Sequence, residues 1–234
     1  QNGALIDNHT VSKTRYGLMP GDHDYTALKS AEKYFPAEVK LNINDYHLTA
    51  AYKEQVERLI KRGCKIDIMG MQMHLFNPKQ CIDIAEGKEL QTPKQVRGYI
   101  ESIKDLKIPL HLSEITIAAP STDEKGFMIQ AIIAQNLYRL WFSMEYMMGI
   151  TWWNVIDNCG LKNEPATSGI YTRDMQPKPV YHALNNLINN EWKTNITTKA
   201  DKQGRVAFRG FKGNYRITWT DKKGNEQTME YYLE

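Results

Sequence analysis

The chain has few cysteines, little net charge and no long apolar run, and each shortage excludes a class of protein. Its 234 residues include three cysteines, Cys64, Cys81 and Cys159, whose spacing fits neither a disulfide framework nor a zinc motif. We therefore expect three small buried side chains. Thirty Lys and Arg against 27 Asp and Glu leave a net charge of +3, which is too small to imply a nucleic-acid partner. No apolar run reaches the roughly 18 residues that span a bilayer, so we expect no membrane partner.

Two further absences concern the N-terminus and the histidines. The first residues, QNGALIDNHTVSK, lack the basic-then-apolar pattern of a signal peptide and do not begin with Met. We expect a processed, truncated or excised segment. His9, His23, His111 and His182 show no metal-ligand spacing, so we expect no metal and no other cofactor.

What the chain does have is a regular alternation of short apolar segments and amphipathic segments. The apolar segments, at 39–44, 66–74, 110–117 and 149–156, predict strands. The segments 25–35, 49–62, 93–106, 125–147 and 179–190 predict helices, the first of them capped by Asp24. Such alternation predicts parallel strands joined by right-handed crossovers. The strands are nearly continuous apolar runs, which is typical of a sheet covered on both faces.

Polar and aromatic residues gather where these strands end. Asn44, Asp45 and Tyr46 lie at the end of the first strand, Gln72 and His74 at the end of the second, Glu114 at the end of the third, and Trp152 and Trp153 at the end of the fourth. Ligands of parallel α/β folds lie beyond the carboxyl ends of the strands. Indole faces stack on sugar rings, and amides and imidazoles bind hydroxyl groups, so a carbohydrate site is indicated. Adjacent strand residues point to opposite faces, so only one of the two tryptophans can line the cleft.

Glu114 lies in PLHLSEITIA, a segment that otherwise reads as a buried strand. Burying a carboxylate is costly, so Glu114 is either a hydrogen-bonded structural residue or a catalytic one. Its place at the carboxyl end favours catalysis, with His74 on the neighbouring strand as a donor that orients Glu114 and keeps it ionised. For Asp45 a structural role, bonding loop amides, is as plausible as a binding role.

Five segments together resemble glycoside hydrolase family 10, the endo-β-1,4-xylanases. They are KLNINDYH, MGMQMHL, PLHLSEITI, GITWWNVID and DMQPKPVYHAL, and they occur in the family's order and spacing. The resemblance implies a (β/α)8 TIM barrel, of which residues 1–194 supply the second half, strands 5–8. Residues 195–234, with alternating runs at 205–209, 214–220 and 227–233, predict a β-hairpin or meander extension packed on the barrel.

The resemblance also implies a retaining mechanism, in which two carboxylates roughly 5–5.5 Å apart flank the scissile bond. By position, Glu114 matches the nucleophile, and His74 matches the histidine that hydrogen-bonds it. Four residues match the substrate-binding positions of the cleft: Asn44, Tyr46, Gln72 and Trp153. The implied activity is hydrolysis of xylan or xylo-oligosaccharide by a secreted, periplasmic or cell-surface enzyme.

Three departures from the family pattern limit this interpretation. The D-V-V-N-E-type motif of the acid/base glutamate is absent and is expected just upstream of residue 1, in the N-terminal half of the same barrel, which is then the implied protein partner. The tryptophan of the S-W-R loop has no counterpart in 158–165. SEIT, Ser113 to Thr116, replaces the common T-E-L-D. The chain alone is therefore expected to be inactive, and two alternatives stay open: a non-catalytic carbohydrate-binding fragment, or a barrel glycosidase acting on another β-glycan.

Overall fold

The computed structural model describes residues 22–46 and 50–233. The chain divides into two compact units, 1–183 and 184–234, which are described separately. The division falls within a helix, whereas the sequence placed the domain boundary after residue 194, and that boundary stays a prediction.

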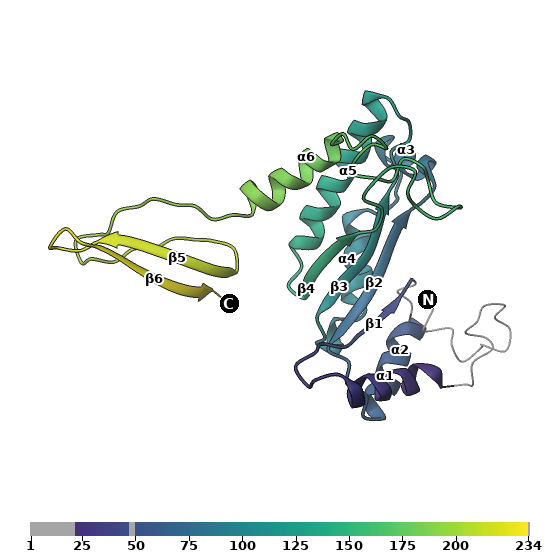
Figure 1. Cartoon of the computed structure of the whole chain (residues 1–234), viewed down its shortest axis with the longest axis horizontal. Helices are drawn as coiled ribbons and strands as arrows, with labels where there is room; N and C mark the ends of the chain where they lie inside the picture. Colours follow the sequence, from purple (N-terminus) through teal and green to yellow (C-terminus); the bar gives the residue numbers. More distant parts are fainter. Residues whose placement is uncertain (1–21, 47–49, 234) are drawn as a thin grey trace. The chain divides into compact units, whose positions relative to one another are not determined.

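The first unit is built on a parallel sheet with strand order β1-β2-β3-β4. The elements in chain order are α1 (His23–Tyr34), β1 (Asn42–Asp45), α2 (Ala50–Lys61), β2 (Ile68–Leu75), α3 (Pro78–Ala85), α4 (Pro93–Glu101), a 3-10 turn (Lys104–Leu106), β3 (Leu110–Ile117), α5 (Glu124–Phe142), β4 (Met147–Trp152) and the start of α6 (Pro179–Asn186) (Figure 1). The rest of α6 and the π turn that follows it (Leu187–Glu191) belong to the second unit. The predicted alternation is confirmed, whereas α3, within the segment between the second strand and the helix at Pro93, was not predicted.

Local chemistry explains where the helices begin. Thr92 and Asn77 each form a capping box with the residue three positions later, ahead of a proline in the first turn of α4 and α3. Asp123 caps α5 by accepting a hydrogen bond from Gly126 N. The cap predicted for the first helix is wrong. Asp24 lies inside α1, where its carboxylate accepts hydrogen bonds from Tyr25 N and Gln55 Nε2.

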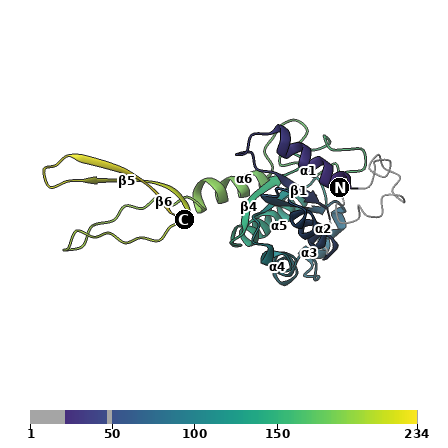
Figure 2. The ribbon, with the colours of Figure 1, turned by 90° about the horizontal axis from the view of Figure 1, so that it is seen from below.

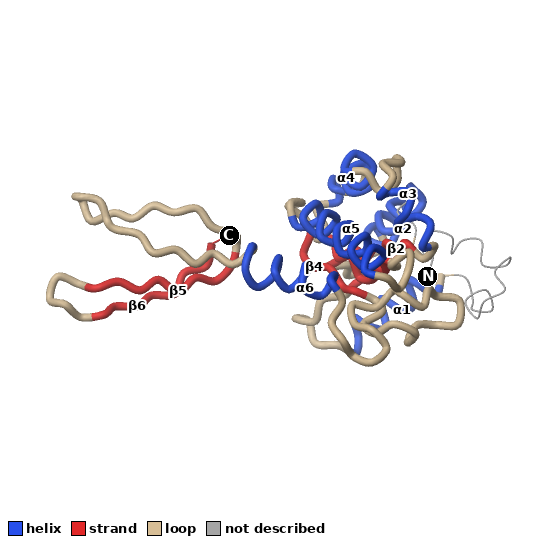
Figure 3. Tube along the Cα trace, turned by 90° about the horizontal axis from the view of Figure 1, so that it is seen from above, coloured by secondary structure: helices blue, strands red, loops and turns tan. Residues whose placement is uncertain are grey.

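Helices cover one face of this sheet, where α3, α4 and α5 lie together on the same side of the strands (Figures 2 and 3). Helix α5 packs on α3, β3 and β4, and its Ala134, Leu137 and Trp141 are buried. Beneath the helices, β3 contributes four buried side chains, Leu110, Leu112, Ile115 and Ile117. Burial of apolar surface at this interface is the main source of stability, at about 25 cal/mol per Å².

A β-bulge in β3 sets the direction of the Glu114 side chain. Leu112 pairs with Met71 of β2 and Ile150 of β4, but the next pairs are Glu114 with Gln72 and Ile115 with Trp152. One residue, Ser113, is therefore extra relative to both neighbours. The bulge shifts the two-residue alternation, so that the apolar side chains at 110, 112, 115 and 117 all face the helices and Glu114 faces the opposite side.

The second unit contains an antiparallel hairpin of β5 (Gly213–Thr220) and β6 (Glu226–Leu233), joined by a turn in which Gly224 has φ +84°. The predicted small antiparallel element is present, but the run 205–209 forms no strand. Phe208 instead places its ring 5.6 Å from that of Tyr215. The packing of this extension on the barrel stays a prediction.

The expectation of three buried cysteines is confirmed in part. Cys64 and Cys81 are buried, but the expectation is wrong for Cys159, which is exposed. It lies in the loop after β4, where its Sγ accepts a 2.5 Å hydrogen bond from Arg173 Nη1. Across 22–46 and 50–233, every helix is too short or too polar to cross a bilayer.

Candidate active site

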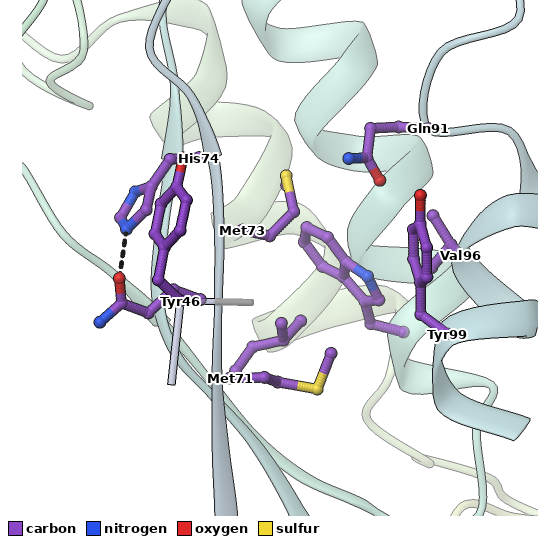
Figure 4. Close-up of a pocket in the computed structure, with 10 residues that line it drawn as sticks. Tyr46, Met71, Met73, His74, Gln91, Val96 and Tyr99 are labelled. Atoms are coloured by element: carbon purple, nitrogen blue, oxygen red, sulfur yellow. Dashed lines mark hydrogen bonds between the residues drawn. The ribbon is translucent and has the colours of Figure 1, made fainter. Parts of the chain in front are cut away.

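Two cross-strand pairs at the carboxyl ends of β2 and β3 form the centre of the site. Gln72 lies opposite Glu114, and His74 lies opposite Thr116. Because paired residues in a sheet point to the same face, the structure brings together three of the predicted site residues. The Nε2 atom of His74 is 3.6 Å from Glu114 Oε2 and 3.3 Å from Gln72 Oε1, and Figure 4 marks the second contact with a dashed line.

His74 is almost fully buried. Its side chain is 3% exposed, and its ring is stacked with Phe76 at 4.3 Å and with Tyr46 at 5.9 Å between centroids. Figure 4 shows the Tyr46 ring beside His74. The Nδ1 atom contacts Thr116 Oγ1 at 2.9 Å. Burial lowers the pKa of His74 to about 4, although the negative charge of Glu164 acts in the opposite direction. The imidazole is therefore neutral at pH 7.

Glu114 is partly buried, with 23% of its side chain exposed. Burial raises the pKa of the Glu114 carboxyl above its ordinary value, and the negative charge of Glu164 adds to this increase. The neutral imidazole of His74 offers an N–H dipole and no positive charge. Any stabilisation of the Glu114 carboxylate by His74 would therefore come from this N–H group, and the expectation that His74 orients Glu114 and keeps it ionised stays a prediction.

Glu164, in the loop after β4, is the site residue that sequence reasoning missed. Its Oε1 accepts a 3.0 Å hydrogen bond from Trp153 Nε1, and its Oε2 accepts from Asn154 Nδ2 at 2.9 Å and Leu161 N at 3.2 Å. These donors, with a contribution from His74, outweigh burial and lower the pKa of Glu164. The only available sequence signal was a lone glutamate in a polar loop that follows the two tryptophans.

The two tryptophans have different environments. Trp152 pairs with Ile115, on the helix side of the sheet, and its Nε1 donates to Asn154 O at 2.8 Å and Ser168 O at 3.0 Å. Trp153 is 43% exposed, so it has a ring face free for a ligand. Of the two, Trp153 is the one placed to line a cleft.

Asn44 and Tyr46 reach the site from β1. Asn44 Oδ1 accepts a 2.6 Å hydrogen bond from the Ser113 hydroxyl, so the bulge residue ties β1 to β3. Tyr46 is 40% exposed and stacks on His74. Asp45 is fully buried, which favours the structural alternative over direct ligand binding.

Two hollows adjoin this centre. One, of about 380 Å³, is lined by Tyr46, Gln72 and His74 and by the apolar side chains of Met71, Met73, Val96 and Trp141. The polar side chains of Gln91 and Tyr99 lie across it from His74 and Tyr46 (Figure 4). The other, about 410 Å³ and open to solvent, lies between Phe76, Pro120 and the loop that carries Glu164.

A buried ion pair anchors the loop after β4. Lys178, 1% exposed, donates to Asp157 Oδ1 at 3.0 Å and to the carbonyls of Gly169 and Thr167. Asp157 Oδ1 also accepts from Gly169 N at 2.7 Å. Burial lowers the pKa of Lys178 against the opposing effect of Asp157. The part of the chain that the structure describes contains no group of His, Cys, Asp and Glu able to hold a metal ion.

The family of the chain follows from a sequence comparison. The family model "Glycosyl hydrolase family 10" matches residues 2–187, which include every residue of the site above. The chain belongs to this family. The predicted membership is thereby confirmed.

Individual family 10 relatives are distant in sequence. Endo-1,4-beta-xylanase A of Thermoanaerobacterium saccharolyticum and Exoglucanase XynX of Acetivibrio thermocellus are each 24% identical over 192 residues, which is 78% of this chain and 16% of the relative. The structure of TsXylA, an intracellular xylanase from T. saccharolyticum, as a mutant with xylotetraose, superposes with a TM-score of 0.60 at 21% identity, covering 77% of this chain and 55% of that one. The fold is therefore part of a (β/α)8 barrel, and the chain spans about half of that solved chain and a sixth of the curated relatives.

Proposed function

We propose that this chain is the nucleophile-bearing part of a retaining glycoside hydrolase that cleaves xylan. The observation that carries the proposal is the β3 bulge, which turns Glu114 to the side of Gln72 and His74 at the carboxyl end of a family 10 sheet. The name endo-1,4-beta-xylanase of one relative and the xylotetraose bound to TsXylA support a xylan substrate.

In the first step, the Glu114 carboxylate attacks the anomeric carbon, and the bond from that carbon to the leaving oxygen breaks. The leaving oxygen takes a proton from a general acid. In the second step, water attacks the same carbon, its proton goes to the now basic acid/base residue, and the bond to Glu114 breaks. Trp153 stacks under the sugar beside the cleaved bond, and Asn44, Tyr46 and Gln72 bind its hydroxyls.

Glu164 is not suited to be the general acid. Three donors hold its carboxylate, and its pKa is lowered, whereas a general acid needs a raised pKa to hold its proton at neutral pH. We therefore propose that the acid/base glutamate comes from the N-terminal half of the barrel, which is the protein partner of this chain.

A substrate with an activated leaving group tests the nucleophile separately from the acid. A dinitrophenyl 2-deoxy-2-fluoro-xylobioside needs no protonation of its leaving group, so attack by Glu114 releases dinitrophenol and leaves a stable glycosyl-enzyme. With the N-terminal half present, we expect mass spectrometry to locate the label on Glu114 and Glu114→Gln to abolish labelling. Labelling of another residue, or unchanged xylan hydrolysis by Glu114→Ala, excludes this role.

A second candidate is a glycosidase acting on another β-glycan, which the name exoglucanase of XynX favours. Product release from xylan, mixed-linkage glucan and cellulose distinguishes the two substrates. Binding of xylo-oligosaccharide without any turnover, in the presence of the N-terminal half, would instead identify a non-catalytic carbohydrate-binding protein.

A further inference from the structure

Thr116 lies where the family pattern T-E-L-D carries an aspartate, and its hydroxyl contacts His74 on the side away from Glu114. We propose that Thr116 is a positioning residue, whose hydroxyl donates to His74 Nδ1 and so fixes the imidazole proton on Nε2, facing Glu114. For catalysis this inference rests on the proposed function, but the position of the proton is a property of the free protein.

The first step of the argument concerns the Nε2 side of the ring. Two oxygens face this atom, Gln72 Oε1 at 3.3 Å and Glu114 Oε2 at 3.6 Å. An ionised carboxylate only accepts hydrogen bonds. A hydrogen on Nε2 gives both oxygens a donor, so the geometry favours this position of the proton whenever Glu114 is ionised, as a nucleophile has to be.

The second step concerns Nδ1. A neutral imidazole with a hydrogen on Nε2 has a lone pair on Nδ1 and needs a donor there. The Thr116 hydroxyl, at 2.9 Å, is such a donor. Thr116 is fully buried, so solvent does not compete, and among the described residues its hydroxyl has no other hydrogen-bond partner.

The third step is the contrast between a hydroxyl and a carboxylate at this position. An aspartate could only accept, so it would draw a proton onto Nδ1 and favour a cationic imidazole beside the nucleophile. A threonine hydroxyl lets the ring stay neutral and still fixes its tautomer. The ionisable groups that face His74 are Tyr46 from the end of β1, Glu114 from β3 and Glu164 from the loop after β4.

Nitrogen NMR of the ¹⁵N-histidine-labelled chain at pH 7 tests this directly. The chain has six histidines, and His74→Gln identifies the resonances of His74. We expect wild-type His74 as a single neutral form with its proton on Nε2, the same form in Thr116→Ser, and a mixture of the two tautomers in the nearly isosteric Thr116→Val. His111, which makes a 2.9 Å contact with the Thr151 hydroxyl, is the internal control and should not change in either variant.

A proton on Nδ1 in the wild type, or an unchanged His74 in a folded Thr116→Val, overturns the inference. The NMR measurements need no substrate. The proposal can therefore fail while the hydrolase assignment stands, and the hydrolase assignment can fail while the proposal stands.

The activity of the variants gives a second test. Where hydrolysis is measured, we expect Thr116→Val to lower kcat roughly tenfold, the scale of one lost hydrogen bond, whereas Thr116→Ser, which keeps the hydroxyl, should have the kcat of the wild type. Thr116→Asp should move the acid limb of the rate profile to lower pH, with Thr116→Asn as the neutral control.

Discussion

The indole nitrogen of Trp153 donates a 3.0 Å hydrogen bond to Glu164 Oε1. This bond joins the exposed aromatic ring after β4 to the carboxylate whose charge acts on both His74 and Glu114. One loop residue thus holds a sugar-stacking surface in place and influences the ionisation of the proposed nucleophile.

Replacing Glu164 with Gln keeps its size and removes its charge. The charge of Glu164 raises the pKa of Glu114, so we expect the pKa of Glu114 to fall in Glu164→Gln. The acid limb of the activity profile should move to lower pH, measured with the N-terminal half present. Glu54→Gln, on the exposed side of α2, is the matched control, and a shift of equal size in that variant contradicts the assignment.

The two tryptophans should separate binding from stability. Trp153→Ala removes an exposed ring, and we expect xylo-oligosaccharide affinity, measured by calorimetry, to fall by about 1–3 kcal/mol, the scale of one aromatic stacking partner, while unfolding changes little. Trp152→Phe removes two hydrogen bonds to Asn154 O and Ser168 O and should instead lower the unfolding free energy. The reverse pattern would show that Trp152 is the ring that contacts the sugar.

Much of this site could be predicted from the sequence because it depends on strand order. Polar residues after successive apolar strands lie at one edge of a parallel sheet, which placed Gln72, His74 and Glu114 together. The bulge at Ser113 was not predicted, although the apolar positions 110, 112, 115 and 117 already contain its shift in alternation. Glu164 could not be predicted, because a loop contact across ten residues has no periodic pattern. The neutrality of His74 depends on burial, which spacing alone does not reveal.

The buried pair of Lys178 and Asp157 should be a strong stability determinant. Lys178→Met leaves Asp157 inside without a counter-charge, and we expect a loss of about 3–5 kcal/mol in urea unfolding. The double variant Lys178→Met with Asp157→Asn should recover part of this loss. Lys79→Met, which breaks an exposed pair with Asp83, is the control and should cost under about 1 kcal/mol. Equal losses in both single variants would mean that burial does not strengthen the Lys178 contact.

The depressed pKa of His74 should make stability fall with acid. The pKa of His74 is about 4 in the folded chain, against an ordinary histidine pKa of 6.5, so the unfolded chain takes up the proton first as the pH falls. The contribution of the neutral His74 ring to the unfolding free energy is fully present above about pH 6.5. It decreases as the pH falls to about 4, by about 3 kcal/mol in all.

Urea unfolding of wild type and His74→Gln at pH 7 and pH 4.5 measures this contribution. Glu114, whose pKa is raised, binds its proton more readily when folded and so offsets part of the loss at the acid end. We therefore expect the wild type to lose more stability than His74→Gln between these two pH values. In Glu114→Gln the offset is absent and the loss should be larger than in the wild type. Parallel behaviour of wild type and His74→Gln would show that the pKa of His74 is the same in the folded and the unfolded chain, which would contradict the depressed pKa.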